Sequence, residues 1–469
     1  MTHVHFIGIG GSGLSAIARL LLESGYKVSG SDRALTPFAD EVRKAGAAVY
    51  IGHHARNIAK ADWVVRSSAV GDDNPEVQAA MRANIPVYKR ADFLGQLMSD
   101  KVGIAIAGTH GKTTTTAMTA WVLSELKRDP SFIIGGVSKN FGVNARAGKG
   151  NLFVIEADEY DNMFLGLKPQ IEVVTSLEHD HPDFFPNFHA MYQSFEKFTD
   201  LLSSDGTLIV CAEDPGAAAL IPHARKSGKN VIGYGVQNED TLNTPLWVTA
   251  RDVKSNQRGG FDFVVSSNLK SAGLNSAEVH LQVPGEHNVR NALAALAIVD
   301  VLGLSRDKAA QALGKFTGTS RRFELRGEVD GISVFDDYAH HPTEIKATLA
   351  GARARFPKRR IWAVWQPHTY SRTHALYLEF SRAFKDADEV IVTEVYASRE
   401  QQENFTSAEI VSGMPHHSAR FIALLDSVTK YLLEHLKPGD VLIVLSAGDA
   451  NKICADVLKG LKGKVDDHE

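Results

Sequence analysis

The chain has 469 residues, of which 44% are apolar and 23% are charged, and its formal net charge at pH 7 is −4. This balance is typical of a globular protein in solution and offers no electrostatic case for binding nucleic acid or an anionic membrane. Because one hydrophobic core rarely grows beyond ~300 residues, we expect about two to four domains.

The cysteine content and the N-terminus both favour the cytoplasm. Cys211 and Cys454 are too few and too far apart to form a disulfide framework. No basic stretch precedes the first expected strand at Val4, and no run approaches the ~18 apolar residues of a membrane span. We therefore expect a cytoplasmic protein without a membrane-spanning segment.

A glycine turn, Gly8–Gly13, follows the strand pattern Val4–Ile7 and precedes a helical pattern from Leu14 to Leu22. A second strand ends at Asp32, about twenty residues later, as in dinucleotide-binding folds. Such a turn lets a pyrophosphate approach the backbone closely. The turn therefore predicts a pyrophosphate site, and both NAD and a UDP-sugar fit it.

The rest of the first hundred residues alternates between strands and helices. Strands are expected at 48–50, 63–66 and 85–88, and helices at 38–45 and 74–83. This alternation is typical of a doubly wound parallel sheet. Ligands bind at the carboxyl edge of such a sheet, and the candidates in the loops there are His53, Ser67, Ser68 and Arg90.

A second glycine turn, Gly108–Thr114, follows the apolar run at 102–107 and precedes a helical pattern that begins at Ala117. Strand, glycine turn, Lys112, Thr113 and helix together form a phosphate cradle in which a threonine hydroxyl can hold Mg²⁺. The full eight-residue motif requires glycine at position 106, where this chain has Ile106, so the match is to a shorter loop. The stretch predicts nucleotide phosphate binding.

After an apolar segment at Phe132–Val137, two further apolar strands end in carboxylates and histidines, in Glu156–Glu159 and Glu178–Asp183. An acid at the end of such a strand commonly holds or orients Mg²⁺ beside a phosphate loop. No cysteine lies nearby, so a hard-metal site completed by substrate phosphate fits better than a closed zinc site. We take Glu156 and His181 as the candidate metal ligands.

The sheet is expected to continue with strands at 207–211 and 230–234, followed by an antiparallel excursion over 240–283. An alanine-rich helix then opens with His287, Asn288 and Asn291 in about its first turn. We predict that Asn288 caps this helix, whereas Asn291 lies inside it and invites a functional role.

The stretch Phe316–Glu324 is a joint of small residues followed by Arg321 and Arg322, and another α/β alternation begins there. Strands are expected at 332–336, 361–365, 389–393 and 441–445, with helices at 343–355, 374–385, 406–412 and 425–435. Two strand ends are rich in polar side chains, Asp336–Pro342 and Gln366–Arg372. Guanidinium groups there are suited to phosphate or carboxylate.

Seven blocks in order resemble the Mur ligase family of peptidoglycan synthesis, over nearly the whole chain. They are Gly8–Gly13, Gly108–Thr114, Glu156–Glu159, Asp180-His181, His287–Ala292, Arg321-Arg322 and Asp336–Pro342. Ser67–Ala69, Asp337–Pro342 and Gln366–His368 with Arg372 make it most similar to members that attach L-alanine to UDP-N-acetylmuramate.

The resemblance implies an α/β fold of three domains. These are a Rossmann-like UDP-sugar-binding domain at 1–100, a central P-loop ATPase domain with a mostly parallel sheet at 101–318, and a Rossmann-like C-terminal domain that closes over the site at 319–469. It also implies that ATP phosphorylates the lactoyl carboxylate, that the amine of L-alanine attacks the acyl phosphate, and that ADP and phosphate leave. ATP and Mg²⁺ are the implied cofactors.

The resemblance carries roles onto individual residues. For catalysis it implies Lys112, Glu156, His181, Arg322 and His341, and for the metal Thr113, Glu156 and His181. For ATP it implies Gly108, Thr109, His110, Gly111, Lys112, Thr113, Thr114, His287, Asn291, Arg322 and Asp337. For the UDP-sugar it implies Gly8, Gly10, Gly11, Ser12, Gly13, Asp32, His53, Ser67 and Arg90, and for the amino acid His341, His368 and Arg372.

Two positions depart from the family pattern. Tyr160 stands where the L-alanine-adding members commonly have serine, and a tyrosine at this position resembles the tripeptide-recycling ligase. Thr369 stands where an arginine is usual. The nearest alternative is therefore attachment of L-Ala-γ-D-Glu-meso-diaminopimelate to the same UDP-sugar. More distant alternatives are an NAD(P)-dependent oxidoreductase and a non-catalytic P-loop module. We expect a monomer or homodimer that binds no nucleic acid.

Overall fold

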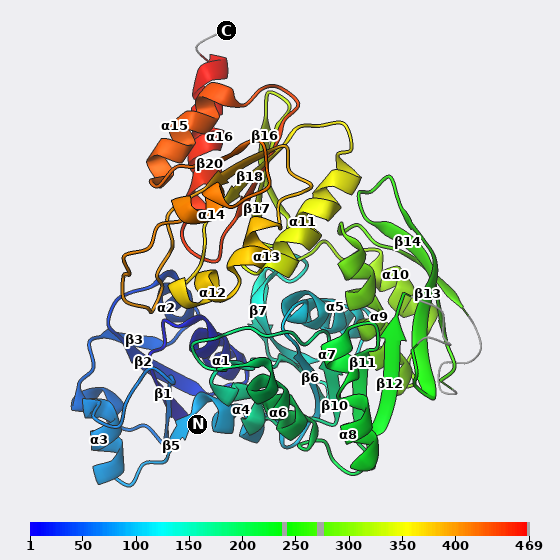
Figure 1. Ribbon diagram of the computed structural model, residues 1–469. Coiled ribbons are helices and arrows are strands. Elements are labelled where there is room, and N and C mark those ends of the chain that lie inside the picture. The colour runs from blue at the N-terminus through cyan, green and yellow to red at the C-terminus, as the bar shows by residue number, and fades with distance from the viewer. Residues whose placement is uncertain (237–241, 270–275, 467–469) are drawn as a thin grey trace.

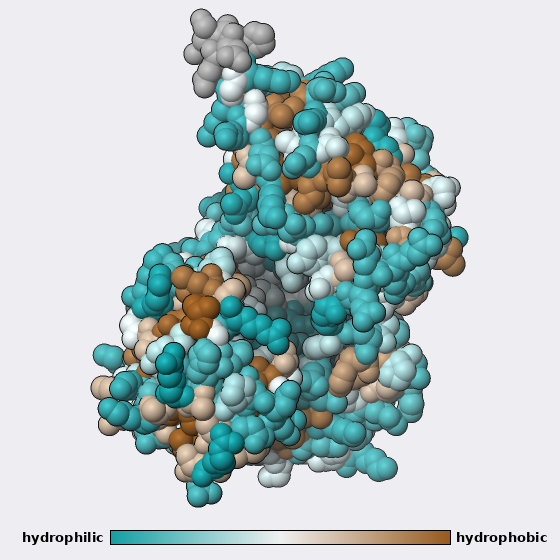
Figure 2. Space-filling view, turned by 90° about the vertical axis from the view of Figure 1, so that its left-hand side faces the viewer, coloured by the Kyte–Doolittle hydropathy of each residue, from teal (hydrophilic) through white to brown (hydrophobic). Residues whose placement is uncertain are grey.

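The computed structural model describes residues 1–236, 242–269 and 276–466, which fold around three separate sheets (Figure 1). The N-terminal and central parts lie side by side, and the C-terminal part lies above them (Figure 1). The predicted three-domain α/β fold class is confirmed. A space-filling view shows a hollow lined largely by hydrophilic residues between the C-terminal part and the parts below it (Figure 2).

The N-terminal sheet has five parallel strands in the order β3-β2-β1-β4-β5. Its central strand β1 is wholly buried, and its two buried histidines, His3 and His5, each bond Ser29 Oγ at 2.8 Å. The strands are β1 His3–Ile7, β2 Lys27–Asp32, β3 Ala48–Ile51, β4 Trp63–Arg66 and β5 Val87–Lys89. The helices are α1 Ser12–Glu23, α2 Pro37–Lys44, the 3₁₀ turn η1 Ala55–Ile58, α3 Pro75–Arg82 and α4 Arg90–Met98.

The central sheet has ten strands in the order β15-β14-β13-β12-β11-β10-β6-β9-β7-β8. Its strands are β6 Val102–Ala107, β7 Ser131–Ser138, β8 Val143–Arg146, β9 Leu152–Glu156, β10 Ile171–Val174, β11 Thr207–Cys211, β12 Asn230–Gly235, β13 Leu246–Ser255, β14 Phe261–Ser267 and β15 Ala277–His280. Its helices are α5 Lys112–Glu125, η2 Tyr160–Gly166, α6 Phe188–Thr199, α7 Pro215–Ala218, α8 Ile221–Lys226, α9 Glu286–Val301 and α10 Arg306–Leu313.

The antiparallel excursion predicted over 240–283 is present in β13, β14 and β15, which pair antiparallel in turn. Residues 240, 241 and 270–275 of that prediction lie outside the described residues. Helices α5 and α9 pack together over one face of the parallel strands, and their buried alanines and leucines form the main central core. The site described below is built at the N-terminal ends of these two helices.

The C-terminal sheet has the order β16-β17-β21-β18-β19-β20, parallel except for the β16–β17 pair. Its strands are β16 Glu324–Val329, β17 Ile332–Asp337, β18 Ile361–Trp365, β19 Glu389–Val392, β20 Ala419–Phe421 and β21 Val441–Leu445. Its helices are α11 Pro342–Arg355, α12 Tyr370–Ala375, α13 Tyr377–Ser381, α14 Ala408–Ser412, α15 Leu425–His435 and α16 Lys452–Asp466.

The differences from the expected elements have identifiable causes. Strands β8, β16 and β20 were not expected, and each is an edge strand with few buried apolar side chains. Helices α6 and α16 were also not expected; α16 contains Gly460 and Gly463, which weaken its helical signal. The single helix expected at 374–385 is wrong, because the chain leaves helical geometry at Leu376 (φ −116°, ψ 25°) between α12 and α13.

Within the described residues, no helix combines the length and apolar character needed to cross a membrane. Both cysteines are buried and free, in agreement with the expected absence of a disulfide framework.

Candidate active site

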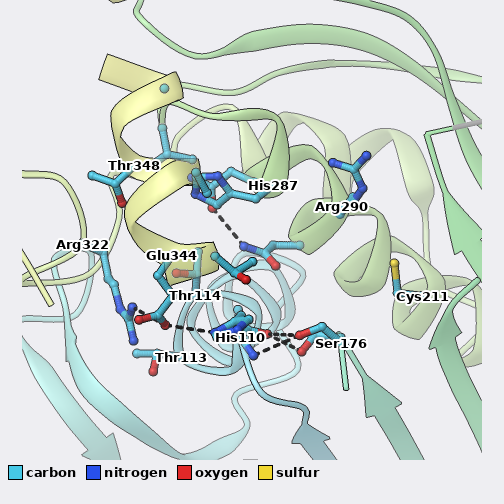
Figure 3. A pocket seen from close by; sticks show the side chains of 18 of the residues that line it. His110, Thr113, Thr114, Ser176, Cys211, His287, Arg290, Arg322, Glu344 and Thr348 are labelled. Carbon is cyan, nitrogen blue, oxygen red and sulfur yellow. Dashed lines mark hydrogen bonds and ion pairs between the residues drawn. The ribbon is translucent and has the colours of Figure 1, made fainter. Parts of the chain in front are cut away.

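A cavity of about 440 Å³ lies between the central and C-terminal domains (Figure 3). Its walls come from the start of α5, the start of α9, the joint at 318–323 and helix α11. His110, Thr113 and Arg322 gather at one end of it, and Cys211 and Arg290 lie toward the other (Figure 3). The two glycine turns therefore do not share one pocket, because only the second lines this cavity.

The phosphate loop joins β6 to α5, and its geometry requires two of its glycines. At Gly108 (φ +127°) a Cβ would lie 2.3 Å from Thr175 Oγ1, and at Gly111 (φ +81°) it would lie 2.7 Å from Asn291 Oδ1. Helix α5 begins at Lys112, so the expected helical start at Ala117 is wrong. The intervening threonines are weak helix formers, and burial of Thr115 and Thr116 overrides that preference.

Hydrogen bonds hold the Lys112 side chain within the phosphate loop. Its Nζ donates to Glu159 Oε1 at 2.8 Å and to the carbonyl oxygens of Gly108 and Thr109. Burial raises the pKa of Glu159 to about 7, although the charge of Lys112 opposes that shift. Burial disfavours the charge of Lys112, but Glu159 outweighs burial and raises the pKa of the lysine. A charged Lys112 is thus held at the N-terminus of α5, where a phosphate binds.

Glu156 and Thr113 lie together at the ends of β9 and the phosphate loop. Thr113 Oγ1 donates to Glu156 Oε1 at 2.9 Å, and the Gly135 N–H donates to Glu156 Oε2 at 2.6 Å. His181 Nε2 lies 3.8 Å from Glu159 Oε1, the same oxygen that accepts from Lys112. The structure therefore brings Thr113 and Glu156 into direct contact and places His181 beside Glu159.

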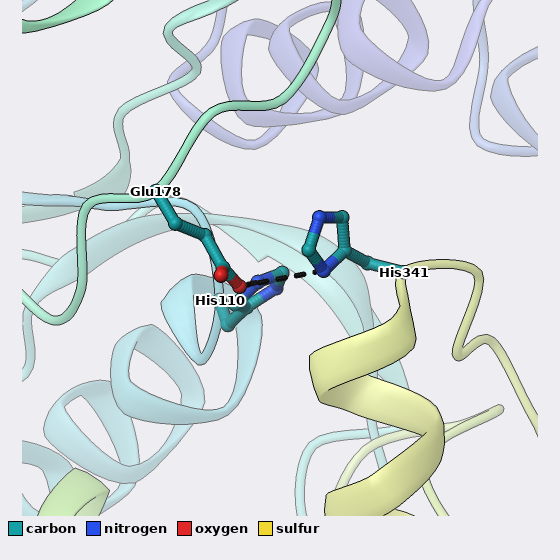
Figure 4. A group of neighbouring side chains, drawn as sticks. All are labelled: His110, Glu178 and His341. Atoms are coloured by element: carbon teal, nitrogen blue, oxygen red, sulfur yellow. Dashed lines mark hydrogen bonds and ion pairs between the residues drawn. The ribbon is translucent and has the colours of Figure 1, made fainter. Parts of the chain in front are cut away.

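His110 connects the phosphate loop to the C-terminal domain (Figure 4). Its Nε2 bonds Glu178, its Nδ1 lies 3.3 Å from Glu344 Oε1 on α11, and its ring centroid lies 4.7 Å from that of His341. Burial opposes the charged ring, but the bonds to Glu178 and Glu344 outweigh burial and raise the pKa of His110 to about 9. For Glu178, burial favours a raised pKa, but the hydrogen bond to His110 and the charge of that ring outweigh burial and lower the pKa to about 2.

This histidine gives stability a predictable pH dependence. Because the folded-state pKa of His110 (about 9) exceeds its ordinary value of 6.5, its contribution is fully present below pH 6.5 and is lost as the pH rises through 9. The shift corresponds to roughly 3 kcal/mol. We expect the Tm of the wild type to fall more steeply between pH 6.5 and 9 than the Tm of His110→Gln.

The control is His223→Gln, which removes a surface histidine that pairs with Asp200 at 2.8 Å. It should follow the wild-type Tm profile. Equal slopes for the wild type and His110→Gln over this pH range would contradict the assignment of a charged His110.

The prediction that Asn288 caps helix α9 is wrong. The N-cap is Gly285, without a side-chain bond, and Asn288 instead donates through Nδ2 to the Pro284 carbonyl at 2.6 Å. Asn288 Oδ1 accepts from Asn291 Nδ2 at 3.0 Å, and Asn291 Oδ1 accepts from Thr115 Oγ1 at 3.1 Å. This amide chain fixes α9 against α5 at the cavity wall.

His287 also lines the cavity. Burial, together with the nearby charge of Arg322, lowers the pKa of His287 to about 4. A neutral imidazole offers one donor and one acceptor, and the Asn291 amide has a second N–H and a second lone pair beyond its bonds to Asn288 and Thr115, so both suit the edge of a base.

The C-terminal domain supplies Arg322 and Asp337 to the same cavity. Arg322 Nη1 lies 3.4 Å from Glu344 Oε1. Asp337 accepts from the N–H groups of Phe323 at 2.8 Å and Ala339 at 2.7 Å, and burial raises its pKa to about 6. The chain on both sides of Arg322 is strained, with positive φ at Arg321 (58°) and Phe323 (47°), as is common at functional sites.

At the junction of the two domains, Arg372 contacts His368, and Arg372 and His341 both act electrostatically on Asp180. The histidine ring beside His368 is that of His340, with 5.8 Å between the centroids. Arg372 is only 3% exposed; its Nε donates to Asp180 Oδ1 at 2.9 Å, and its Nη1 lies 3.1 Å from His368 Nδ1. His341 Nδ1 accepts from the Thr343 N–H at 3.3 Å, whereas its buried Nε2 has no hydrogen-bond partner among the described residues. Burial lowers the pKa of His341 and of His368 to about 4.

The first glycine turn lies apart from the cavity and gathers its own predicted residues. Asp32 Oδ2 accepts from the Gly10 N–H at 2.8 Å, and a Cβ on Gly8 would lie 3.2 Å from Ser67 Cβ. Arg90 lies directly on Gly13 and also reaches Asp158 of the central domain, with 3.4 Å between Nη2 and Oδ2. His53 Nδ1 bonds Ser31 Oγ at the end of β2, 2.8 Å away, and Gly11 and Ser12 are exposed on the same turn.

Four acids in the site were not among the predicted site residues: Glu159, Glu178, Asp180 and Glu344. The first three stand in the acid-rich runs after β9 and β10, so a sequence signal for them existed. Glu344 stands inside α11 and had none, because its position beside the phosphate loop depends on how the C-terminal domain packs on the central one.

Comparison with known proteins shows matches along almost the whole chain. Residues 3–102 match the Mur ligase family, catalytic domain; residues 106–299 match the Mur ligase middle domain; and residues 321–448 match the Mur ligase, glutamate ligase domain. The chain is 43% identical over 466 residues to UDP-N-acetylmuramate–L-alanine ligase of Desulfosudis oleivorans, and the match covers 98% of each chain.

Solved structures with the same fold include two relatives of differing specificity. UDP-N-acetylmuramate-alanine ligase MurC of Thermotoga maritima superposes with a TM-score of 0.79 at 30% identity, covering 99% of this chain and 100% of that one. The murein peptide ligase of Psychrobacter arcticus superposes with a TM-score of 0.71 at 28% identity, covering 98% and 99%.

Proposed function

The chain belongs to the Mur ligase family, and from this premise we infer that it joins L-alanine to the lactoyl carboxylate of UDP-N-acetylmuramate while ATP is converted to ADP and phosphate. The observation that carries this proposal is the meeting of two domains at one cavity. Glu344 of the C-terminal domain reaches the phosphate loop at His110, and Arg322 pairs with Glu344 and lines the same cavity. When two domains meet over a site they can keep water away from it, and an acyl phosphate needs that protection from hydrolysis.

A carboxylate does not react with an amine until one of its oxygens becomes a good leaving group. The γ-phosphate of ATP supplies that group: the carboxylate oxygen attacks phosphorus, ADP leaves, and the amine then displaces phosphate from the acyl carbon. Lys112 and Arg322 offset the charge that accumulates as two anions approach each other. The neutral His341 accepts the Thr343 N–H at Nδ1, so its Nε2, unpartnered among the described residues, carries the ring hydrogen and can donate a hydrogen bond to a substrate oxygen in the subsite proposed for the amino acid.

Thr113 and Glu156 are suited to Mg²⁺, because both present oxygen donors and lie 2.9 Å apart beside the phosphate loop. We propose that they hold the metal with His181. Mg²⁺ would neutralise phosphate charge when bound. His287, Asn291 and Asp337 line the part of the cavity proposed for adenine and ribose, and the turn Gly8–Gly13 is proposed for the UDP-sugar.

The remaining expectations stay proposals with supporting observations. We propose domain boundaries at 1–100, 101–318 and 319–469, since the three sheets have their strands within these ranges. A cytoplasmic location agrees with two buried free cysteines and with a requirement for ATP. The state of monomer or homodimer is a prediction for solution measurements.

The alternatives account for less of the molecule. Relatives that match nearly the full chain at 41–43% identity are L-alanine ligases, which favours the small amino acid over the tripeptide. An NAD(P)-dependent oxidoreductase would leave the cavity between the central and C-terminal domains without a role.

Phosphate release tests the proposal. The protein is incubated with ATP, Mg²⁺ and UDP-N-acetylmuramate, and L-alanine, glycine, L-serine or the tripeptide is added in turn. We expect release that depends on all substrates and is fastest with L-alanine, with incomplete discrimination, since one methyl group contributes only about 1–3 kcal/mol. Release with the tripeptide alone would establish the recycling ligase instead, and no release with any amine would refute the proposal.

Gly13→Ala tests the assignment of the first glycine turn. A Cβ there would lie 1.9 Å from Arg90 Nη1 and displace the guanidinium. Since a hydrogen bond to a charged group is worth about 1.5–3 kcal/mol, binding of UDP-N-acetylmuramate should weaken by about tenfold or more in calorimetry, while ATP binding is unchanged. Gly463→Ala, where a Cβ meets nothing within 4 Å, is the control; unaltered UDP-sugar binding in Gly13→Ala would contradict the assignment.

A further inference from the structure

Tyr160, Asp183 and Arg399 form a contact between the central and C-terminal domains, named here the Arg399 clamp. Arg399 Nε donates to Asp183 Oδ2 at 3.0 Å, and Tyr160 Oη donates to the same oxygen at 3.1 Å. The guanidinium carbon of Arg399 lies 4.3 Å from the centre of the Tyr160 ring. Tyr160 and Asp183 belong to the segments after β9 and β10, whereas Arg399 stands in the loop after β19.

On the side of the central domain, the clamp adjoins the candidate active site. The Tyr160 ring centroid lies 5.0 Å from that of His181 and 5.6 Å from that of Phe184. Asp183 follows His181 by two residues, in the same turn that presents Asp180 to Arg372. The Arg399 clamp therefore contacts the segment that carries His181, a candidate metal ligand.

On the side of the C-terminal domain, the loop that bears Arg399 is bonded to the loop that bears His368 and Arg372. Glu400 accepts from the N–H groups of Tyr370 at 2.6 Å and Ser371 at 3.2 Å, so it caps the start of α12. Tyr396 exchanges backbone hydrogen bonds with the 367–369 segment, and its ring stacks on His368 with 5.9 Å between centroids. The loop that bears Arg399 and the loop that bears His368 and Arg372 are therefore held together by hydrogen bonds, and a shift of one is expected to move the other.

We infer that the Arg399 clamp positions the subsite for the incoming amino acid. By docking on Asp183 and Tyr160, Arg399 sets where His368 and Arg372 stand relative to Asp180 and His181. The side chain of Arg399 is 45% exposed and that of Asp183 is 23% exposed, so the contact lies at the rim and can open when the domains separate. This inference rests on the proposed function. Arg399 is a positioning residue, because it acts on the amino acid subsite through the loop that bears His368 and Arg372.

The test separates the Michaelis constants of the three substrates. In Arg399→Ala we expect the KM for L-alanine to rise about tenfold, while the KM values for ATP and UDP-N-acetylmuramate stay within about twofold. Tyr160→Phe removes only the hydroxyl hydrogen bond and should raise the KM for L-alanine by a smaller factor. The charge exchange Asp183→Arg with Arg399→Asp should recover part of the loss that either single change causes.

Arg420→Ala is the matched control, because Arg420 makes the same kind of contact within one domain. Its Nη2 lies 2.7 Å from Glu389 Oε2, and its guanidinium carbon lies 4.9 Å from the Tyr431 ring centre. This variant should keep all three KM values. Equal changes in every KM, or an unchanged KM for L-alanine in Arg399→Ala and Tyr160→Phe, would overturn the inference. Absence of L-alanine-dependent phosphate release in the wild type would instead refute the proposed function.

Discussion

Replacing Lys112 with alanine is expected to lower kcat by about 10³-fold or more while leaving the affinity for UDP-N-acetylmuramate unchanged. Lys112 is a half-buried cation at the N-terminus of α5, and its Nζ lies 2.8 Å from Glu159 Oε1. Removal of a single preorganised donor to developing charge commonly costs about 10²–10³ in rate, and here the charge of the donor is lost as well. The deletion also leaves Glu159 buried without its cation.

Two measurements decide this prediction. Single-turnover phosphate release reports the chemical step, and calorimetry with UDP-N-acetylmuramate reports the N-terminal domain. Lys101→Ala is the control, because among the described residues Lys101 Nζ donates only to the Gly150 carbonyl of the same domain, at 2.6 Å. Loss of UDP-sugar binding in Lys112→Ala would show that the two glycine turns have been assigned to the wrong ligands.

Replacing Arg322 with alanine is expected to lower kcat by about 10²–10³-fold, the second largest effect. Arg322 belongs to the C-terminal domain, yet it lines the cavity of the phosphate loop and lies 3.4 Å from Glu344, which also contacts His110. Its planar guanidinium can bind a phosphoryl group bidentately. Arg322→Lys keeps the charge without that geometry, so it should recover only part of the rate.

Arg326→Ala is the matched control, since Arg326 is an exposed neighbour that pairs only with Glu324 at 3.5 Å in the described contacts. It should retain wild-type kcat. If Arg322→Ala changes only the KM for ATP and leaves kcat intact, Arg322 binds the nucleotide without taking part in phosphoryl transfer.

Local sequence patterns predicted those parts of the fold that depend on local chemistry. Buried parallel strands such as Val102–Ala107 are continuous apolar runs, so they could be predicted. The two glycine turns could also be predicted, because each directly joins a strand to the next helix. The edge strands β8, β16 and β20 could not, because their stability comes from one neighbouring strand and not from burial of their own side chains.

The candidate site shows the same division. Glu156 and Thr113 lie in recognisable strand-end and loop positions, and the structure brings them into contact. Glu344 and Arg399 could not be predicted, since each acts across the domain junction on partners more than two hundred residues away in the chain, His110 and Asp183. Such pairings depend on how the domains dock, which no local pattern encodes.

The central claim is that the γ-phosphate is transferred to a carboxylate and not to water, and an isotope measurement tests it most directly. UDP-N-acetylmuramate labelled with ¹⁸O in both oxygens of the lactoyl carboxylate is converted with ATP and L-alanine, and the released phosphate is analysed by mass spectrometry. Transfer through an acyl phosphate predicts that each phosphate carries one carboxylate oxygen, while the other remains in the new amide. Unlabelled phosphate released with the amide product would contradict the acyl phosphate and the reaction built on it.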